Sequence, residues 1–338
     1  MSTEATAGVV TVRLLVAMFL FVTACGATPP PTPDDTPTPT QGDAPPASAG
    51  HSLVYAQHAG MVVLVNAGLG GMTSPAASTL TRIWGWTGTQ WRLLDSSGPP
   101  VRNLGGVAYD SRRNVLVLFG GGYDATHIYG DTWEWSGTWR QISGDGPEAR
   151  DHTQMAYDVD RGRVVLFGGS GANPNVAFGE TWEFDGTRWQ RAAASGPAGR
   201  VHHALQYDAQ AHRTVMYGGF VPGSAALGET WTWNGTTWES SSSGPARSHL
   251  RMAFHGRLGS LLAFGGFPGA DLNLLARQGE QWTSLASAGG PGARYLADAA
   301  YDPQRQRLVL FGGGDPGGSA LFADTWEFDG TIWTRVRQ

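Results

Sequence analysis

The arrangement of apolar and polar positions repeats along the chain from residue 51 to its end. In the clearest unit, MAYD at 155–158 predicts a strand that ends at a turn. The continuous apolar run that follows at 163–167 predicts a strand covered on both faces. Further on, Trp182 and Phe184 stand two positions apart and therefore share one face of a third strand. The Asp-Gly pair at 185–186 predicts a hairpin turn into a short fourth strand.

Six copies of this unit fill residues 51–338. A closing tryptophan marks each copy, 44 to 51 residues after the last, at positions 91, 139, 189, 238, 282 and 333. A glycine pair stands upstream in five copies, and Asn66-Ala67 replaces it in the first. The copy at 274–282 is degenerate, since Leu275 and Arg277 stand where the other copies have a tryptophan and a phenylalanine or tryptophan. Six units of four strands predict a closed ring of four-stranded blades.

A repeat of this length with a glycine pair and paired aromatic residues resembles the kelch repeat. The resemblance covers residues 51–338 and implies an all-β, six-bladed propeller of kelch type, with four antiparallel strands per blade. The repeats start with an inner strand and finish with an outer one, so no blade needs to contain both chain ends. We therefore expect side-chain packing between the first and last blades to close the ring. All 14 tryptophans lie in the repeats and are expected to pack blade against blade.

The first 50 residues have a different character. An apolar run at 14–22 is too short to span a bilayer but suits the core of a signal peptide. The sequence VTAC at 22–25 follows it and resembles the bacterial lipobox, which implies cleavage after residue 24 and lipidation of Cys25. Residues 25–50 are rich in proline and threonine and predict a disordered linker. The expected location is the cell envelope, lipid-anchored on the extracytoplasmic side of a bacterial membrane. The alternative is ordinary signal cleavage beside an incidental cysteine.

Composition narrows the range of partners. The formal net charge is −5, so we expect no nucleic-acid partner, and any attraction to a polyanion must be local. All 23 basic residues are arginine. Because Cys25 is the single cysteine, the chain contains no internal disulfide. We also expect a monomer without a cofactor.

The candidate ligand contacts come from one end of the predicted ring. An arginine precedes the predicted inner strand in five of the six units, at Arg102, Arg150, Arg200, Arg247 and Arg294. By resemblance to kelch proteins, arginines at this place line the mouth of a pocket and contact acidic ligands. Variable loops on the same face add the aromatic candidates Tyr123, Tyr129, Phe178 and Phe220. The alternative is structural: inter-blade ion pairs between the arginines and four acids at a fixed place, Asp131, Glu180, Glu229 and Asp324.

Other candidate chemistry is weak. His152, His202 and His249 stand in register, but equivalent positions of a six-fold ring often lie far apart, so we expect no metal site. The repeated aspartates Asp110 and Asp158 are explained by turn chemistry, and no carboxylate pair predicts catalytic residues.

Three kinds of function remain open. The leading hypothesis is a surface-displayed binding module for a glycan, an acidic peptide or an envelope protein. An alternative is a carbohydrate-active enzyme, such as an epimerase similar to the kelch sialic-acid mutarotases. A third is a scaffold for an envelope complex. The copper radical oxidases of the kelch class need a cysteine cross-linked to a tyrosine, and residues 51–338 contain no cysteine. The fold alone does not choose among these functions.

Overall fold

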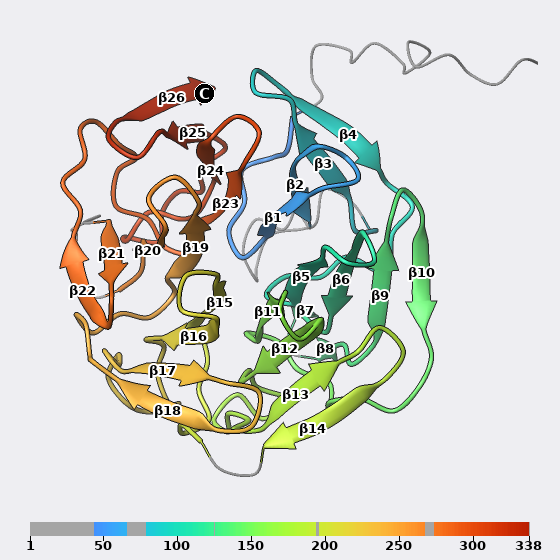
Figure 1. Ribbon diagram of the computed structural model, residues 1–338. Coiled ribbons are helices and arrows are strands. Elements are labelled where there is room, and N and C mark those ends of the chain that lie inside the picture. Colours follow the sequence, from blue (N-terminus) through green and yellow to red (C-terminus); the bar gives the residue numbers. More distant parts are fainter. Residues whose placement is uncertain (1–43, 66–78, 125, 194–195, 268–273, 338) are drawn as a thin grey trace, which may run out of the picture. The chain divides into compact units, whose positions relative to one another are not determined.

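The computed structural model describes residues 44–65, 79–124, 126–193, 196–267 and 274–337. These residues form six four-stranded antiparallel sheets arranged as blades around a central axis, and none of them is helical (Figure 1). The all-β, six-bladed propeller predicted from the repeats is therefore confirmed. The predicted signal segment 1–24 and Cys25 lie outside the described residues.

Each blade is built from one stretch of chain. Blade 1 contains β1 (Ser52–Ala56), β2 (Met61–Val65), β3 (Ile83–Trp86) and β4 (Trp91–Asp95). Blade 2 contains β5 (Gly106–Asp110), β6 (Val115–Phe119), β9 (Thr132–Trp135) and β10 (Trp139–Ile142), and a small hairpin of β7 (Gly122–Asp124) and β8 (His127–Ile128) lies between β6 and β9. Blade 3 contains β11 (Gln154–Asp158), β12 (Arg163–Phe167), β13 (Thr181–Phe184) and β14 (Trp189–Ala193).

The remaining blades follow the same order. Blade 4 contains β15 (Ala204–Asp208), β16 (Arg213–Tyr217), β17 (Thr230–Trp233) and β18 (Trp238–Ser241). Blade 5 contains β19 (Arg251–His255), β20 (Ser260–Phe264), β21 (Leu275–Gln278) and β22 (Gln281–Ser284). Blade 6 contains β23 (Asp298–Asp302), β24 (Arg307–Phe311), β25 (Thr325–Phe328) and β26 (Trp333–Arg337). The first strand of each blade is the innermost.

Blades 1 and 6 close the ring without exchanging a strand, as the order of the repeats predicted. Apolar side chains of both blades form one cluster, in which Leu64 and Trp91 accompany Val309 and Phe311. Polar bonds cross the same junction, because Trp86 Nε1 donates to Glu327 Oε1 at 2.7 Å. Residues 44–50, assigned to the linker by sequence, also pack here: Ser48 is fully buried and donates its N–H to the carbonyl of Phe322.

The closing tryptophans join neighbouring blades. In four of the six, the indole N–H donates to a threonine at the start of the third strand of the preceding blade, at 2.7–2.9 Å, in the pairs Trp91–Thr325, Trp189–Thr132, Trp238–Thr181 and Trp282–Thr230. Blade 1 has Ile83 at the threonine position, and the indole nitrogen of Trp139 in blade 2 is buried without a partner among the described residues. The tryptophans therefore pack between blades, as predicted, and most also anchor them by a directed bond.

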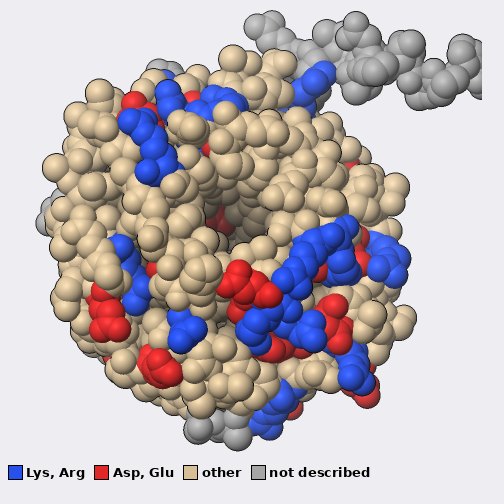
Figure 2. All heavy atoms as spheres, viewed as in Figure 1, with Lys and Arg blue, Asp and Glu red and all other residues tan. Residues whose placement is uncertain are grey.

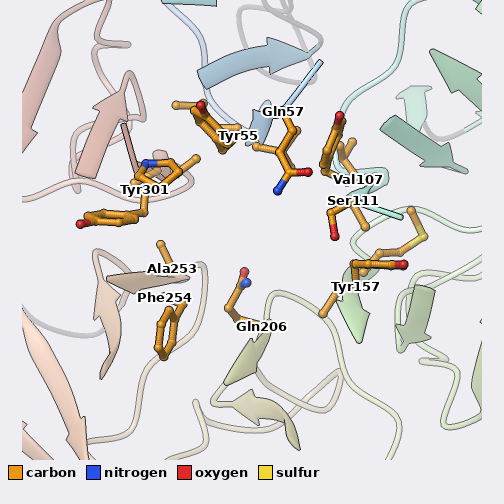
Figure 3. Close-up of a pocket in the computed structure, with 18 residues that line it drawn as sticks. Tyr55, Gln57, Val107, Ser111, Tyr157, Gln206, Ala253, Phe254 and Tyr301 are labelled. Atoms are coloured by element: carbon orange, nitrogen blue, oxygen red, sulfur yellow. The ribbon is translucent and has the colours of Figure 1, made fainter. Parts of the chain in front are cut away.

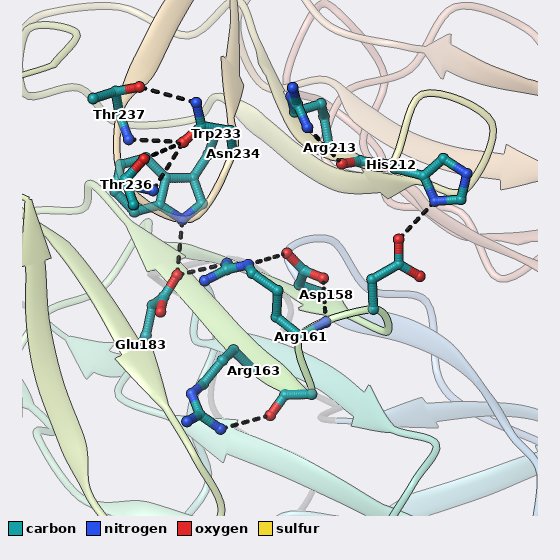
Figure 4. A network of polar contacts seen from close by, with 12 residues as sticks. Asp158, Arg161, Arg163, Glu183, His212, Arg213, Trp233, Asn234, Thr236 and Thr237 are labelled. Atoms are coloured by element: carbon teal, nitrogen blue, oxygen red, sulfur yellow. Dashed lines mark hydrogen bonds and ion pairs between the residues drawn. The ribbon is translucent and has the colours of Figure 1, made fainter.

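A second set of contacts repeats at the turns between first and second strands. In blade 3, Arg161 binds Asp158 at 2.7 Å and Glu183 at 2.6 Å, and Glu183 also accepts the indole N–H of Trp233 in blade 4 at 2.8 Å (Figure 4). Gly235 of blade 4 has a φ of +100°, and a side chain there would clash with Arg161. The largely buried Glu183 carboxylate is thus hydrogen-bonded by both blades, which fixes their spacing.

Between blades 4 and 5 the corresponding carboxylate, Asp208, is paired in a different way. Arg277 stands in β21 where Trp233 stands in β17, and it binds Asp208 of blade 4 at 3.1 Å. Blade 4 has Ala211 where blade 3 has Arg161, so Asp208 lacks an arginine from its own turn. In the degenerate repeat an arginine therefore replaces the aromatic ring, and its charge neutralises the Asp208 carboxylate of the neighbouring blade.

Candidate functional site

The five arginines predicted as ligand contacts lie inside the blades. Their exposed fractions are 0% at Arg102 and Arg150, 1% at Arg200, 7% at Arg247 and 3% at Arg294. Arg294 is typical: its guanidinium binds the carbonyl of Gly312 and the carboxylate of Asp324, both at 2.8 Å. The ion pairs Arg102–Asp131, Arg150–Glu180 and Arg200–Glu229 repeat this arrangement.

These ion pairs resemble the structural alternative, with one correction. Each pair links two segments of the same blade, whereas the sequence suggested pairs between blades. Two aromatic candidates cover the arginines, since Tyr129 lies 4.0 Å from the Arg102 guanidinium and Phe178 lies 3.9 Å from that of Arg150. A role of these residues in ligand contact stays a prediction.

One end of the axis, here called the capped face, is closed by the residues two positions after the five arginines and by Gly50, which takes the equivalent place in blade 1. All six have a left-handed backbone, with φ between 52° and 77°: Gly50, Leu104, His152, His202, His249 and Leu296. Backbone hydrogen bonds link neighbours in this ring, as from Gly50 N to Leu296 O at 3.0 Å. A left-handed backbone is uncommon outside glycine, so the mutual hydrogen bonds and packing must hold it.

The three histidines of the capped face lie together, contrary to the expectation that they stand far apart. The rings of His152 and His202 are 4.3 Å apart and those of His202 and His249 are 3.6 Å apart. Phe220 stacks on His202 and His249, while Tyr123 is 37% exposed near His127. Burial lowers the pKa of His249 to about 4, so its ring is neutral at pH 7. No group of three potential metal ligands is found among the described residues.

The opposite end of the axis, the open face, carries the turns between the first and second strands and holds a pocket. Figure 2 shows the ring hollowed at its centre. The pocket has a volume of about 280 Å³. The fourth residue of an inner strand contributes an aromatic ring from five blades, which we call the collar: Tyr55, Tyr109, Tyr157, Phe254 and Tyr301 (Figure 3).

The collar is held by the turns of preceding blades. The Tyr109 hydroxyl accepts the backbone N–H of His58 at 3.0 Å, and the Tyr301 hydroxyl accepts that of Arg257 at 3.2 Å. Burial and the neighbouring carboxylate of Asp110 raise the pKa of Tyr157 to about 12, so this phenol stays protonated. The Tyr157 ring is therefore a fixed aromatic wall rather than an acid–base group at neutral pH.

Polar groups stand between the collar rings. The side chains of Gln57, Ser111 and Gln206 line the pocket, with Gln206 near its centre in Figure 3. Neither glutamine amide is hydrogen-bonded to another described residue. Amides offer both donors and acceptors, so these groups are available to a polar ligand.

A second, smaller chamber of about 40 Å³ adjoins this pocket and shares Leu53, Met155 and Gln206 with its lining, which also includes Arg251 and Asp298. Asp298 accepts the backbone N–H groups of Leu53 and Ala299, each at 2.8 Å. Burial raises the pKa of Asp298 to about 6, although Arg251 opposes the shift. The chamber thus holds one titratable acid and one cation.

Sequence reasoning missed this pocket. A partial signal is a tyrosine directly before the turn aspartate, which recurs in four units at Tyr109, Tyr157, Tyr207 and Tyr301. Three of these tyrosines line the pocket and Tyr207 does not, while Tyr55 and Phe254 join the collar without the aspartate.

Comparison with known proteins supports the fold. The chain is similar to a solved structure entitled "Structure of YjhT", with a TM-score of 0.66, 14% sequence identity, and coverage of 86% of this chain and 98% of that chain. No protein-family model matches the chain, and no curated protein sequence matches it. No helix in the described part of the chain is long and apolar enough to cross a membrane.

Proposed function

We propose that this protein is a non-catalytic binding module that takes the end of a glycan into the pocket of the open face. The observation that carries the proposal is the collar of fixed aromatic rings with the free amides of Gln57 and Gln206 between them. Aromatic faces pack against the apolar C–H face of a sugar ring, and amides bind its hydroxyl groups. A volume of about 280 Å³ lies just below the usual range for drug-sized ligands, which suits a single sugar residue.

The tether supports outward display of this pocket. Ser48 and Gly50 join the capped face, so the linker enters the folded unit at that end of the axis. The proposed lipid on Cys25 and the proline-rich linker would tether this kelch-type propeller to the membrane, with the pocket at the end of the propeller opposite to residues 48–50. A linker extended at about 3.1 Å per residue reaches roughly 75 Å.

A glycan array probed with the purified protein tests the proposal. Phe254→Ala and Gln206→Ala should each weaken binding about tenfold or more, because each removes a wall or a polar contact of the pocket. Tyr123→Ala, on the exposed β7–β8 hairpin outside the pocket, is the matched control and should bind like the wild type. The opposite pattern, with loss of binding only in Tyr123→Ala, would move the site to the loops predicted from the sequence.

One observation favours a second candidate, a carbohydrate-active enzyme. The pKa of Asp298, raised to about 6 by burial, suits an acid–base group near neutral pH. Change of a bound sugar into its anomer or epimer, followed by NMR and lost in Asp298→Asn, would establish this function in place of simple binding.

A further inference from the structure

The chamber that adjoins the pocket contains a cation that the protein itself leaves poorly satisfied. Arg251, the first residue of β19, is 5% exposed and lines the chamber. Its guanidinium makes one hydrogen bond to the described residues, from Nη1 to the carbonyl of Leu250 at 3.1 Å. A guanidinium has five N–H donors, so most of its capacity is unused.

Arg251 differs in this respect from the arginines near the capped face. The Arg294 guanidinium is neutralised by the Asp324 carboxylate at 2.8 Å. Among the described residues, no carboxylate oxygen lies within ion-pair distance of Arg251. Asp298 shares the chamber and, when ionised, attracts Arg251 electrostatically, but each of its oxygens accepts a backbone N–H group and neither forms an ion pair with the guanidinium.

The other titratable groups around Arg251 do not compensate its charge. The charge of Arg251 acts on four nearby histidines: His51, His202, His203 and His249. Burial is the main cause that lowers the pKa values of these histidines, and the charge of Arg251 adds to it. The pKa falls to about 3 for His51 and His203. They are neutral at pH 7 and carry no negative charge. Among the described groups that act on Arg251, Asp298 is the one that can carry a negative charge, and its pKa of about 6 leaves it protonated in mild acid.

We propose that Arg251 binds a carboxylate on the terminal sugar of the ligand, so that the pocket selects acidic sugars over their neutral counterparts. This inference rests on the proposed function. The planar guanidinium fork matches a carboxylate in bidentate geometry. A chamber of about 40 Å³ is small, so it suits one charged group of the sugar rather than a whole sugar ring.

Matched sugar pairs test the selection. Binding of glycans that end in a uronic acid is compared with binding of the same glycans after reduction of the carboxyl group to an alcohol, at pH 5.5. The wild type should prefer the acid at least tenfold. Arg251→Gln should lose this preference yet keep the affinity for the neutral glycan, because the collar is unchanged.

A pH series gives a readout that does not depend on the folding of an Arg251 variant. Above pH 6, Asp298 becomes negative beside the bound carboxylate, so the wild-type affinity for the acid should fall between pH 5 and pH 8. The limit is about tenfold per pH unit. In Asp298→Asn the affinity should stay constant over this range.

The outcomes separate the two proposals. Equal binding of the acid and the reduced glycan by the wild type, or an affinity that falls with pH equally in Asp298→Asn, overturns the role of Arg251 and leaves the glycan site standing. Absence of binding to any glycan overturns both.

Discussion

A buried guanidinium is destabilising unless oxygens surround it, and the arginines near the capped face meet this condition to different degrees. Asp324, the partner of Arg294, has a side chain that is 7% exposed. Glu229, the partner of Arg200, is 45% exposed and is therefore partly hydrated without its arginine. The two pairs occupy the same place in blades 6 and 4, so they form a matched comparison within one protein.

Replacing each arginine by glutamine should destabilise the protein unequally. Arg294→Gln leaves the buried Asp324 carboxylate with only the more distant Arg335 guanidinium, at 3.9 Å, and breaking a buried pair typically costs about 3–5 kcal/mol. Arg200→Gln leaves a carboxylate that water can reach, so the loss from the ion pair itself should be smaller, about 1 kcal/mol. Urea denaturation measures both. Equal and small losses in free energy of unfolding, together with loss of glycan binding, would instead support the ligand role predicted from the sequence.

At the scale of elements, blade 5 is held together by a shorter ladder than its neighbours. β20 and β21 pair through two residue pairs, Leu262–Ala276 and Ala263–Leu275, whereas β12 and β13 pair through four. Leu275 also stands where blades 3 and 4 have Trp182 and Trp231. Fewer hydrogen bonds and less buried aromatic area favour local opening of this blade.

Hydrogen exchange should therefore be faster in blade 5 than in blade 3. The comparison is between residues 260–264 with 275–284 and residues 163–167 with 181–193, within the same sample. The ion pair of Arg277 with Asp208 ties β21 to blade 4 at 3.1 Å and limits the effect. Indistinguishable protection in the two blades would mean that this pair fully offsets the shorter ladder.

Elements were predicted better than the site. The strands follow from the sequence because their partners are close in the chain: Val164 pairs with Phe184, twenty residues on. The pocket joins Tyr157 of blade 3 to Phe254 of blade 5 and Tyr301 of blade 6, which meet only after the ring closes. The left-handed backbone of His202 was equally hidden, since nothing in a local apolar pattern indicates a positive φ at histidine.

At the scale of the whole molecule, the lipid anchor proposed at Cys25 has a direct test. Cys25→Ser removes the thiol that would carry the lipid and leaves the propeller unchanged. The variant should move from the membrane fraction to the soluble fraction when the expressing cells are fractionated. An unchanged share in the membrane fraction would show that another feature holds the protein there.

The closure of the ring makes one junction unlike the other five. Blades 3 and 4 are joined by the chain between β14 and β15, whereas blades 6 and 1 contain the two ends and meet only through side-chain and backbone contacts. The same tryptophan–threonine bond crosses both junctions: Trp238 to Thr181 at 2.7 Å and Trp91 to Thr325 at 2.9 Å. Thr181 and Thr325 are both essentially buried.

Thr181→Val and Thr325→Val are therefore isosteric changes that remove one buried acceptor each. Both should lower the free energy of unfolding by about 1–3 kcal/mol, because an indole N–H loses its partner. Only Thr325→Val loosens a junction without a chain connection, so there the amides of β1, β2, β24 and β25 should exchange faster than the global destabilisation accounts for. In Thr181→Val, hydrogen exchange should rise only as much as the loss in free energy of unfolding accounts for. If Thr325→Val shows the same limited rise, blades 6 and 1 separate only when the whole propeller unfolds.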